Sequence, residues 1–158
     1  MTNQTQTEKN ELRTEIILNA PAEKIWEVLT NLSAYSAWNP FIVKASGKII
    51  EGERLNNTLM NNGKPMTFKP QVTAVAENKR FEWLGTALMG GFKGRHYFEL
   101  EDAGKSRTKL IHGEHFSGFL SGLIFPLLRK NTLSGFMAMN RALQSRLESL
   151  EAHESGKS

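Results

Sequence analysis

The sequence predicts a single α+β domain in which an antiparallel sheet packs against one long C-terminal helix. Two observations support this prediction. Alternating apolar and polar residues, interrupted by turn residues, fill the chain from 41 to 115. Helical periodicity is confined to the ends, at 22–32 and again after Gly118. Runs of strands with helices segregated from them are typical of α+β proteins with an antiparallel sheet.

The composition is that of a globular domain with a sizeable core. Of the 158 residues, 39% are hydrophobic and 23% are charged, which excludes a disordered chain. No apolar run reaches the roughly 18 residues that a transmembrane helix needs. Cysteine is absent, which excludes disulfides and thiol catalysis and suits a reducing compartment. Because the first ten residues lack the apolar core of a signal peptide, we expect a cytoplasmic protein.

The N-terminal part predicts one strand followed by two short helices. We expect residues 1–11 to be a frayed polar tail and residues 12–19 to form the first strand. Pro21 suits the first position of a helix, and Glu23 faces the positive end of the helix dipole. Apolar side chains then recur at helical spacing, and the turn-rich segment 33–40 follows.

The turn at 62–63 predicts the register of a central hairpin. Asn-Gly favours a two-residue type I′ turn, which pairs Leu59 with Met66 and Asn57 with Phe68. One face of this hairpin is then mostly apolar and the other polar, as a half-buried antiparallel sheet requires.

Two further hairpins extend the same inner face. A two-residue turn at 78–79 pairs Ala76 with Phe81. In the last hairpin the apolar alternation pairs His96 with His112. These registers place a largely apolar set on the inner face, but Asn57, His96, His112 and Glu114 interrupt it. Since a buried polar group without a partner costs about 1–3 kcal/mol, these four side chains either satisfy one another or face a cavity.

The C-terminal part predicts one long helix that closes the domain. Apolar residues recur on a single face from Leu128 through Phe136 and Met139, and Pro126 lies near the start of the helix or at a kink. We expect the domain to span 12–150 and residues 151–158 to form a tail.

Several segments together resemble one known family. Residues 16–29, 35–41, 81–83, 96–100 and 114–118 are similar to segments of the SRPBCC superfamily, also called the START-like or helix-grip fold, and within it to the small polyketide cyclase/dehydrase-type proteins. The resemblance implies a curved antiparallel sheet of about seven strands around the C-terminal helix, with two short helices after the first strand and a deep apolar cavity. Members bind or carry lipids, sterols and polyketides, and a minority are enzymes. No catalytic motif is shared, so the resemblance assigns no catalytic residue.

The leading hypothesis is binding or transport of a small hydrophobic or amphipathic ligand in that cavity, without a cofactor. Such sites are mostly apolar with a few convergent polar groups. The residues expected to form the site are Trp38, Phe41, Asn57, Leu59, Met66, Phe68, Trp83, His96, Phe98, His112, Glu114, Phe119, Phe136 and Met139.

Two alternatives stay open at this point. In a cyclase- or dehydratase-like enzyme, His96, His112 and Glu114 would act as acid and base; the same three residues are a weaker candidate for a metal site, and we expect no metal. In an interaction module, the apolar segments 86–92 and 120–128 would meet a partner, or at most touch a membrane transiently. The basic residues are dispersed and no phosphate-binding loop is present, so we expect no nucleic acid partner.

Overall fold

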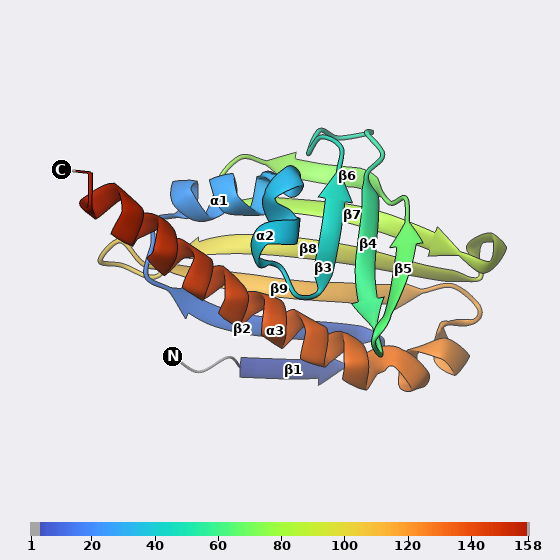
Figure 1. Ribbon diagram of the computed structural model, residues 1–158. Coiled ribbons are helices and arrows are strands. Elements are labelled where there is room, and N and C mark those ends of the chain that lie inside the picture. The colour runs from blue at the N-terminus through green and yellow to red at the C-terminus, as the bar shows by residue number, and fades with distance from the viewer. Residues whose placement is uncertain (1–3, 158) are drawn as a thin grey trace.

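The computed structural model describes residues 4–157, whose strands form two antiparallel sheets with a long helix across one face (Figure 1). In spatial order, the larger sheet consists of β1 (Gln4–Glu8), β2 (Glu11–Leu18), β9 (Thr108–Ser117), β8 (Phe92–Asp102), β7 (Arg80–Ala87) and β6 (Gln71–Ala76). The smaller sheet consists of β3 (Ile42–Ser46), β4 (Asn56–Asn61) and β5 (Lys64–Phe68). The helical elements are α1 (Ala22–Thr30), η1 (Leu32–Ala34), α2 (Tyr35–Trp38), η2 (Leu88–Gly90) and α3 (Ser121–Ser155).

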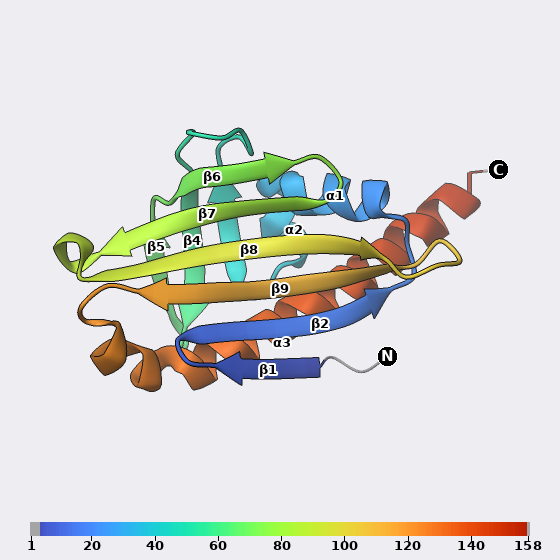
Figure 2. The same cartoon turned by 180° about the vertical axis from the view of Figure 1, so that it is seen from behind.

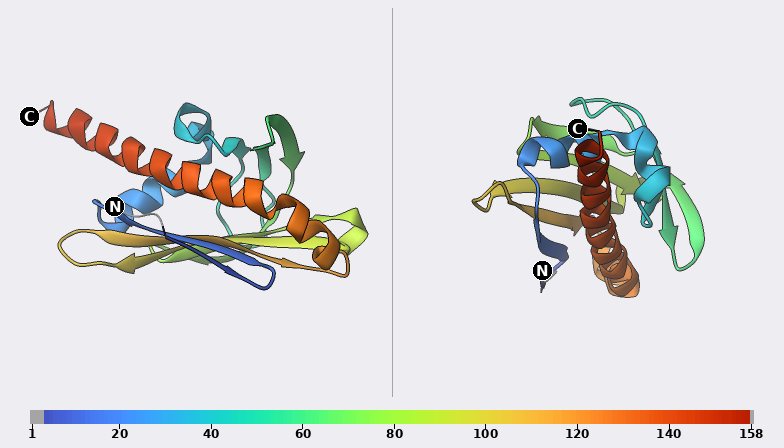
Figure 3. Two further views of the ribbon diagram at one scale, coloured as in Figure 1. Left: turned by 90° about the horizontal axis from the view of Figure 1, so that it is seen from below. Right: turned by 60° about the vertical axis from the view of Figure 1, so that its left-hand side comes forward.

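The large sheet forms one layer, and α3 and the small sheet lie side by side on its inner face. Figure 3 shows α3 running obliquely over the large sheet, with β3–β5 standing beside its first half. Among residues 4–157, no helix covers the outer face of the large sheet (Figure 2). The interior is therefore bounded by the large sheet, the small sheet and α3.

Local sequence patterns explain the packing of these elements. In β2 every second residue is buried, including Leu12, Ile16 and Leu18, because side chains alternate between the two faces of a strand. In α3 the buried residues Phe136, Met139, Asn140, Leu143 and Leu147 recur at helical spacing. Pro126 lies inside α3, and the first turns bend away from the helix axis (Figure 3), since proline breaks the local hydrogen-bond ladder.

The helix-grip prediction is confirmed, and both predicted tails turn out to be partly structured. β1 pairs with the edge of β2 through a turn at Lys9 and Asn10, where Asn10 adopts a left-handed φ of 63°. At the other end α3 continues to Ser155 instead of ending at 150. The strands also divide into sheets of six and three, where one sheet of about seven was expected.

The predicted hairpin registers hold to different extents. Leu59 pairs with Met66 and Asn57 with Phe68, as predicted from the turn at 62–63. The second prediction is wrong by one residue, because Ala76 pairs with Arg80 across a three-residue turn. A bulge between Val72 and Ala74 then restores the inward direction of Val72.

The last hairpin is displaced by two residues from the predicted register. His96 pairs with Glu114 and Phe98 with His112, because the connection at 103–107 is longer than expected and contains left-handed residues. A shift of two residues leaves every side chain on the same face, so the inner face is as predicted but its cross-strand neighbours are not.

Close contacts around Gly113 yield a test of this sheet. A Cβ at Gly113 would collide with the Tyr97 phenol and would lie 2.7 Å from the Leu12 carbonyl oxygen. We expect Gly113→Ala to lower the free energy of unfolding by about 1–3 kcal/mol through overpacking, measured by urea denaturation. Gly122→Ala is the control, because nothing lies within 4 Å of the added Cβ in α3; it should stabilise the helix slightly. Equal stability of Gly113→Ala and wild type would contradict the packing described.

Candidate functional site

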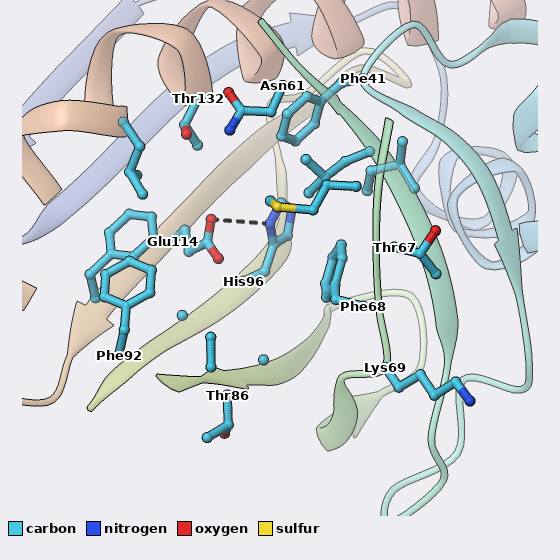
Figure 4. Close-up of a pocket in the computed structure, with 18 residues that line it drawn as sticks. Phe41, Asn61, Thr67, Phe68, Lys69, Thr86, Phe92, His96, Glu114 and Thr132 are labelled. Carbon is cyan, nitrogen blue, oxygen red and sulfur yellow. Dashed lines mark ion pairs between the residues drawn. The ribbon is translucent and has the colours of Figure 1, made fainter. Parts of the chain in front are cut away.

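A cavity of about 480 Å³ lies between the small sheet, the ends of β7–β9 and the first half of α3 (Figure 4). The small sheet and its flanks contribute Phe41, Ile42, Leu59, Asn61, Met66, Thr67, Phe68 and Lys69. The large sheet contributes Gly85, Thr86, Ala87, Phe92, Gly94, His96, Glu114 and Phe116. Leu128 and Thr132 of α3 complete the wall.

Glu114 and His96 form the polar end of this cavity. Glu114 Oε2 lies 3.7 Å from His96 Nδ1, and the Glu114 side chain keeps 18% of its surface exposed (Figure 4). Gly94 makes room for the carboxyl group, because a Cβ at that position would collide with Glu114. Phe92 and Phe116 stack beside this pair with ring centroids 5.4 Å apart, so an apolar wall adjoins the carboxyl group.

A chain of hydrogen bonds leads from α3 and β2 to this pair. The Thr14 hydroxyl donates to the His112 carbonyl at 2.8 Å, and Asn140 Nδ2 donates to Thr14 Oγ1 at 2.8 Å. Asn140 Oδ1 lies 2.8 Å from His112 Nδ1, and His112 Nε2 lies 2.9 Å from His96 Nε2. All four side chains are buried.

The hydrogen-bond partners determine which ring nitrogens carry protons. Thr14 uses its only proton on a carbonyl, so it accepts from the Asn140 amide, and Asn140 presents its oxygen to His112. His112 Nδ1 is therefore the N–H, and its Nε2 accepts from His96 Nε2. His96 Nδ1 consequently presents a lone pair to Glu114.

Burial makes the whole cluster neutral. Desolvation lowers the pKa of His96 to about 3; it also lowers the pKa of His112 well below its ordinary value, with His96 adding to this effect. Desolvation raises the pKa of Glu114 to about 8. At neutral pH Glu114 is thus a carboxylic acid beside an uncharged imidazole, and the pair is not an ion pair.

Aromatic rings hold both imidazoles in place. Trp83 stacks on His96 with centroids 4.9 Å apart and an angle of 15° between the rings. Phe98 and Phe136 lie on either side of His112, at 4.5 and 4.2 Å. These contacts exclude water from the rings, which explains the low pKa of each imidazole.

Six of the residues expected to bind a ligand lie on the cavity wall: Phe41, Leu59, Met66, Phe68, His96 and Glu114. The others are placed elsewhere. Trp83, Phe98, His112, Phe136 and Met139 belong to the packed interior behind the wall. Because α3 covers the middle of the large sheet, inner-face side chains beneath it pack and do not line the cavity.

Three expected site residues lie away from the cavity wall. Phe119 is 83% exposed at the start of α3. Asn57 is fully buried in β4, and neither its amide nitrogen nor its oxygen has a hydrogen-bond partner among the described residues. Trp38 packs against the core from α2 and does not line the cavity.

Sequence reasoning missed several wall residues, and some of them carried a signal. Alternation placed Phe116 on the inner face, although it was not expected in the site, and the same alternation extended to the start of β8 places Phe92 on that face. Leu128 and Thr132 are four residues apart and therefore lie on one side of α3. Ile42 and Lys69 carried no such signal, because their places depend on how the small sheet folds over.

Residues 4–157 contain no group of three or more His, Cys, Asp or Glu side chains arranged to hold a metal ion. Within the same residues, none of the helices combines the length and the apolarity needed to cross a bilayer.

Comparison with known proteins identifies the family. Residues 9–153 match the model of the family described as polyketide cyclase/dehydrase and lipid transport. The chain therefore belongs to this family and to the SRPBCC superfamily, whose members bind hydrophobic ligands and include some cyclases. No curated protein matches the chain.

Solved structures share the fold at low sequence identity. A START superfamily protein from Mycobacterium smegmatis has a TM-score of 0.71 and 21% identity, with 90% of this chain and 99% of that chain covered. The Zhui aromatase/cyclase from Streptomyces sp. R1128 has a TM-score of 0.71 and 15% identity, with coverage of 87% and 93%. A Rhodobacter sphaeroides protein has a TM-score of 0.76 and 13% identity, with coverage of 94% and 99%. These similarities establish the fold.

The raised pKa of Glu114 predicts a specific pH dependence of stability. The folded protein holds this proton more tightly than the unfolded chain, so the contribution of Glu114 is complete at low pH. It is lost as the pH rises from about 4.5 to about 8. We expect wild type to lose stability relative to Glu114→Gln across this range, by an amount of the order of 4 kcal/mol.

Urea denaturation at a series of pH values measures this difference. The histidines are present in both proteins, so their own pH dependence cancels in the comparison. Glu51→Gln, which removes a carboxylate from an exposed loop, is the control for loss of one charge. A constant difference between wild type and Glu114→Gln from pH 4.5 to pH 8 would show that Glu114 is ionised at neutral pH.

Proposed function

We propose that the protein binds a small amphipathic molecule, with its apolar body in the cavity and one uncharged polar group at Glu114 and His96. The observation that carries this proposal is the Glu114–His96 pair on the wall of a largely apolar cavity of about 480 Å³. This volume falls within the range of about 300–1,000 Å³ that is typical of small-molecule sites.

The protonation states favour a hydroxyl group on the ligand. The Glu114 carboxylic acid can donate a hydrogen bond, and His96 Nδ1 can accept one. Their separation of 3.7 Å is too long for a direct hydrogen bond. A ligand hydroxyl accepts from the first and donates to the second, whereas a carboxylate in the same position would place a negative charge against an uncharged, largely buried pair.

Three naphthalene probes with the same apolar body test this preference. We expect 2-naphthol to bind more tightly than naphthalene by about three- to tenfold, the value of one net hydrogen bond, and 2-naphthoate to bind most weakly. Isothermal titration calorimetry at neutral pH measures the three affinities. Tightest binding of 2-naphthoate would refute an uncharged polar site.

A pair of variants on α3 locates the binding in the cavity. Thr132 lies on the wall and Ser134 is exposed on the same helix. Thr132→Phe fills part of the cavity and should weaken 2-naphthol at least about tenfold, because the ring takes the place of the ligand. Ser134→Phe should leave the affinity unchanged. Equal affinities of the two variants would place the binding outside the cavity.

A second candidate function is acid–base catalysis on the bound molecule, as in a dehydratase. It is favoured by the pairing of a protonated carboxyl group with an imidazole lone pair at the cavity wall. In loss of water from a β-hydroxy carbonyl, His96 Nδ1 would take the proton from carbon while Glu114 protonates the departing hydroxyl. The proton then returns from His96 to Glu114. His112 does not reach the cavity and would act only as a positioning residue through His96.

This candidate predicts a loss of turnover without a loss of binding. Glu114→Gln should abolish dehydration of a β-hydroxy ketone probe while keeping 2-naphthol affinity within about threefold, since the amide still donates a hydrogen bond. Wild-type turnover should fall as the pH rises through about 8, where Glu114 loses its proton. Full turnover by Glu114→Gln would exclude this role.

The cytoplasmic location and the absence of a nucleic acid partner stay predictions.

A further inference from the structure

One end of the molecule carries most of its exposed large hydrophobic side chains. Seven such side chains are exposed among the described residues, and five of them lie at this end. Met89 is 105% exposed, Phe119 83% and Leu127 78%. We call this surface the apolar tip; it consists of Leu88, Met89, Phe119, Leu123 and Leu127.

The five side chains come from segments that touch each other. η2 and the start of α3 lie at the same end of the molecule (Figures 1 and 2). The Leu120 backbone N–H donates to the Gly91 carbonyl at 2.8 Å. A Cβ at Gly91 would lie 2.9 Å from the Phe119 ring. Phe119, Leu123 and Leu127 follow at intervals of four residues, so the tip is one continuous surface.

The backbone of η2 is strained in a way that exposes apolar groups. Leu88 and Met89 have φ values of 53° and 56°, a left-handed conformation that L-residues other than Asn and Asp rarely adopt. Each costs of the order of 1 kcal/mol or more. Neither side chain gains burial in return, so folding stability alone does not account for this arrangement.

The two chain segments that form the tip carry basic residues and no acidic ones. Residues 83–98 contain no Asp or Glu, and neither do residues 115–147. Lys93 follows η2, and Arg129 and Lys130 directly follow Leu127 and Leu128. Exposed apolar side chains flanked by cations match the interface of a bilayer with anionic headgroups.

The cavity adjoins the tip along the same elements. Ala87 and Phe92 line the cavity on either side of η2, and Leu128 lines it next to Leu127. The apolar tip therefore lies beside the cavity.

From these observations we propose that the apolar tip docks the protein on an anionic phospholipid bilayer, with Leu88, Met89 and Phe119 inserted between headgroups and Arg129 and Lys130 against phosphates. A bilayer fits better than a protein partner, because the side chains project from a protruding loop and a helix end, and the charged residues of these two segments are all basic. The proposal does not require that the cavity binds a ligand.

Vesicle flotation tests the docking. Vesicles of phosphatidylcholine with phosphatidylglycerol should carry the protein to the top of the gradient, and vesicles of phosphatidylcholine alone should carry much less. Added salt should weaken the binding, because it screens the cations. The double variant Leu88→Asn/Met89→Asn removes both apolar side chains, and asparagine tolerates the left-handed backbone. Its affinity for the mixed vesicles should be at least about tenfold lower than that of wild type. Arg129→Glu/Lys130→Glu should lower binding by about tenfold as well.

A matched control changes one apolar and one basic residue elsewhere. Lys48 and Ile50 are exposed in the loop between β3 and β4, and Lys48→Glu/Ile50→Ser should bind the mixed vesicles like wild type. Thermal melting followed by circular dichroism confirms that all variants fold. Absence of vesicle binding by wild type would overturn the proposal, as would equal losses in tip and control variants. Self-association without vesicles that Leu88→Asn/Met89→Asn abolishes would assign the tip to a second copy of the chain and also overturn it.

Discussion

The hydrogen bond between His112 and Asn140 is the contact on which the rest of the interior depends. It joins β9 of the large sheet to α3 in a space from which water is excluded by Phe98 and Phe136. A buried polar pair of this kind stabilises the fold modestly when complete and strongly destabilises it when one partner is missing. It therefore specifies one position of α3 on the sheet, where apolar contacts alone would tolerate small displacements.

The same contact sets the chemistry of the cavity wall. Because Asn140 accepts from His112, the direction of every later hydrogen bond in the chain is determined, and His96 turns a lone pair toward Glu114. The oblique path of α3 leaves this last pair uncovered while it seals the residues behind it. The cavity thus begins where the packed interior ends, and its polar groups are the exposed end of a buried network.

Neutrality connects the site with its surroundings. Burial raises the pKa of Glu114 to about 8 and lowers that of His96 to about 3, so the wall offers hydrogen bonds without charge. Positively charged side chains lie instead beside the apolar tip, at Arg129 and Lys130. In the two proposals, the cavity wall recognises an uncharged ligand group and the tip approaches an anionic surface, and both features lie at the same end of the molecule.

The sequence by itself determined the alternation of strands, the amphipathic helices, the hairpin at 62–63 and the inner-face positions of His96, His112 and Glu114. Each of these follows from backbone periodicity or turn preference over a few residues. Only the tertiary structure decided that β1 pairs at the sheet edge, that His96 faces Glu114 across the last hairpin, and that six of the expected site residues reach the cavity. Those outcomes depend on loop conformation and on where α3 crosses the sheet, which are set by contacts between residues far apart in the chain.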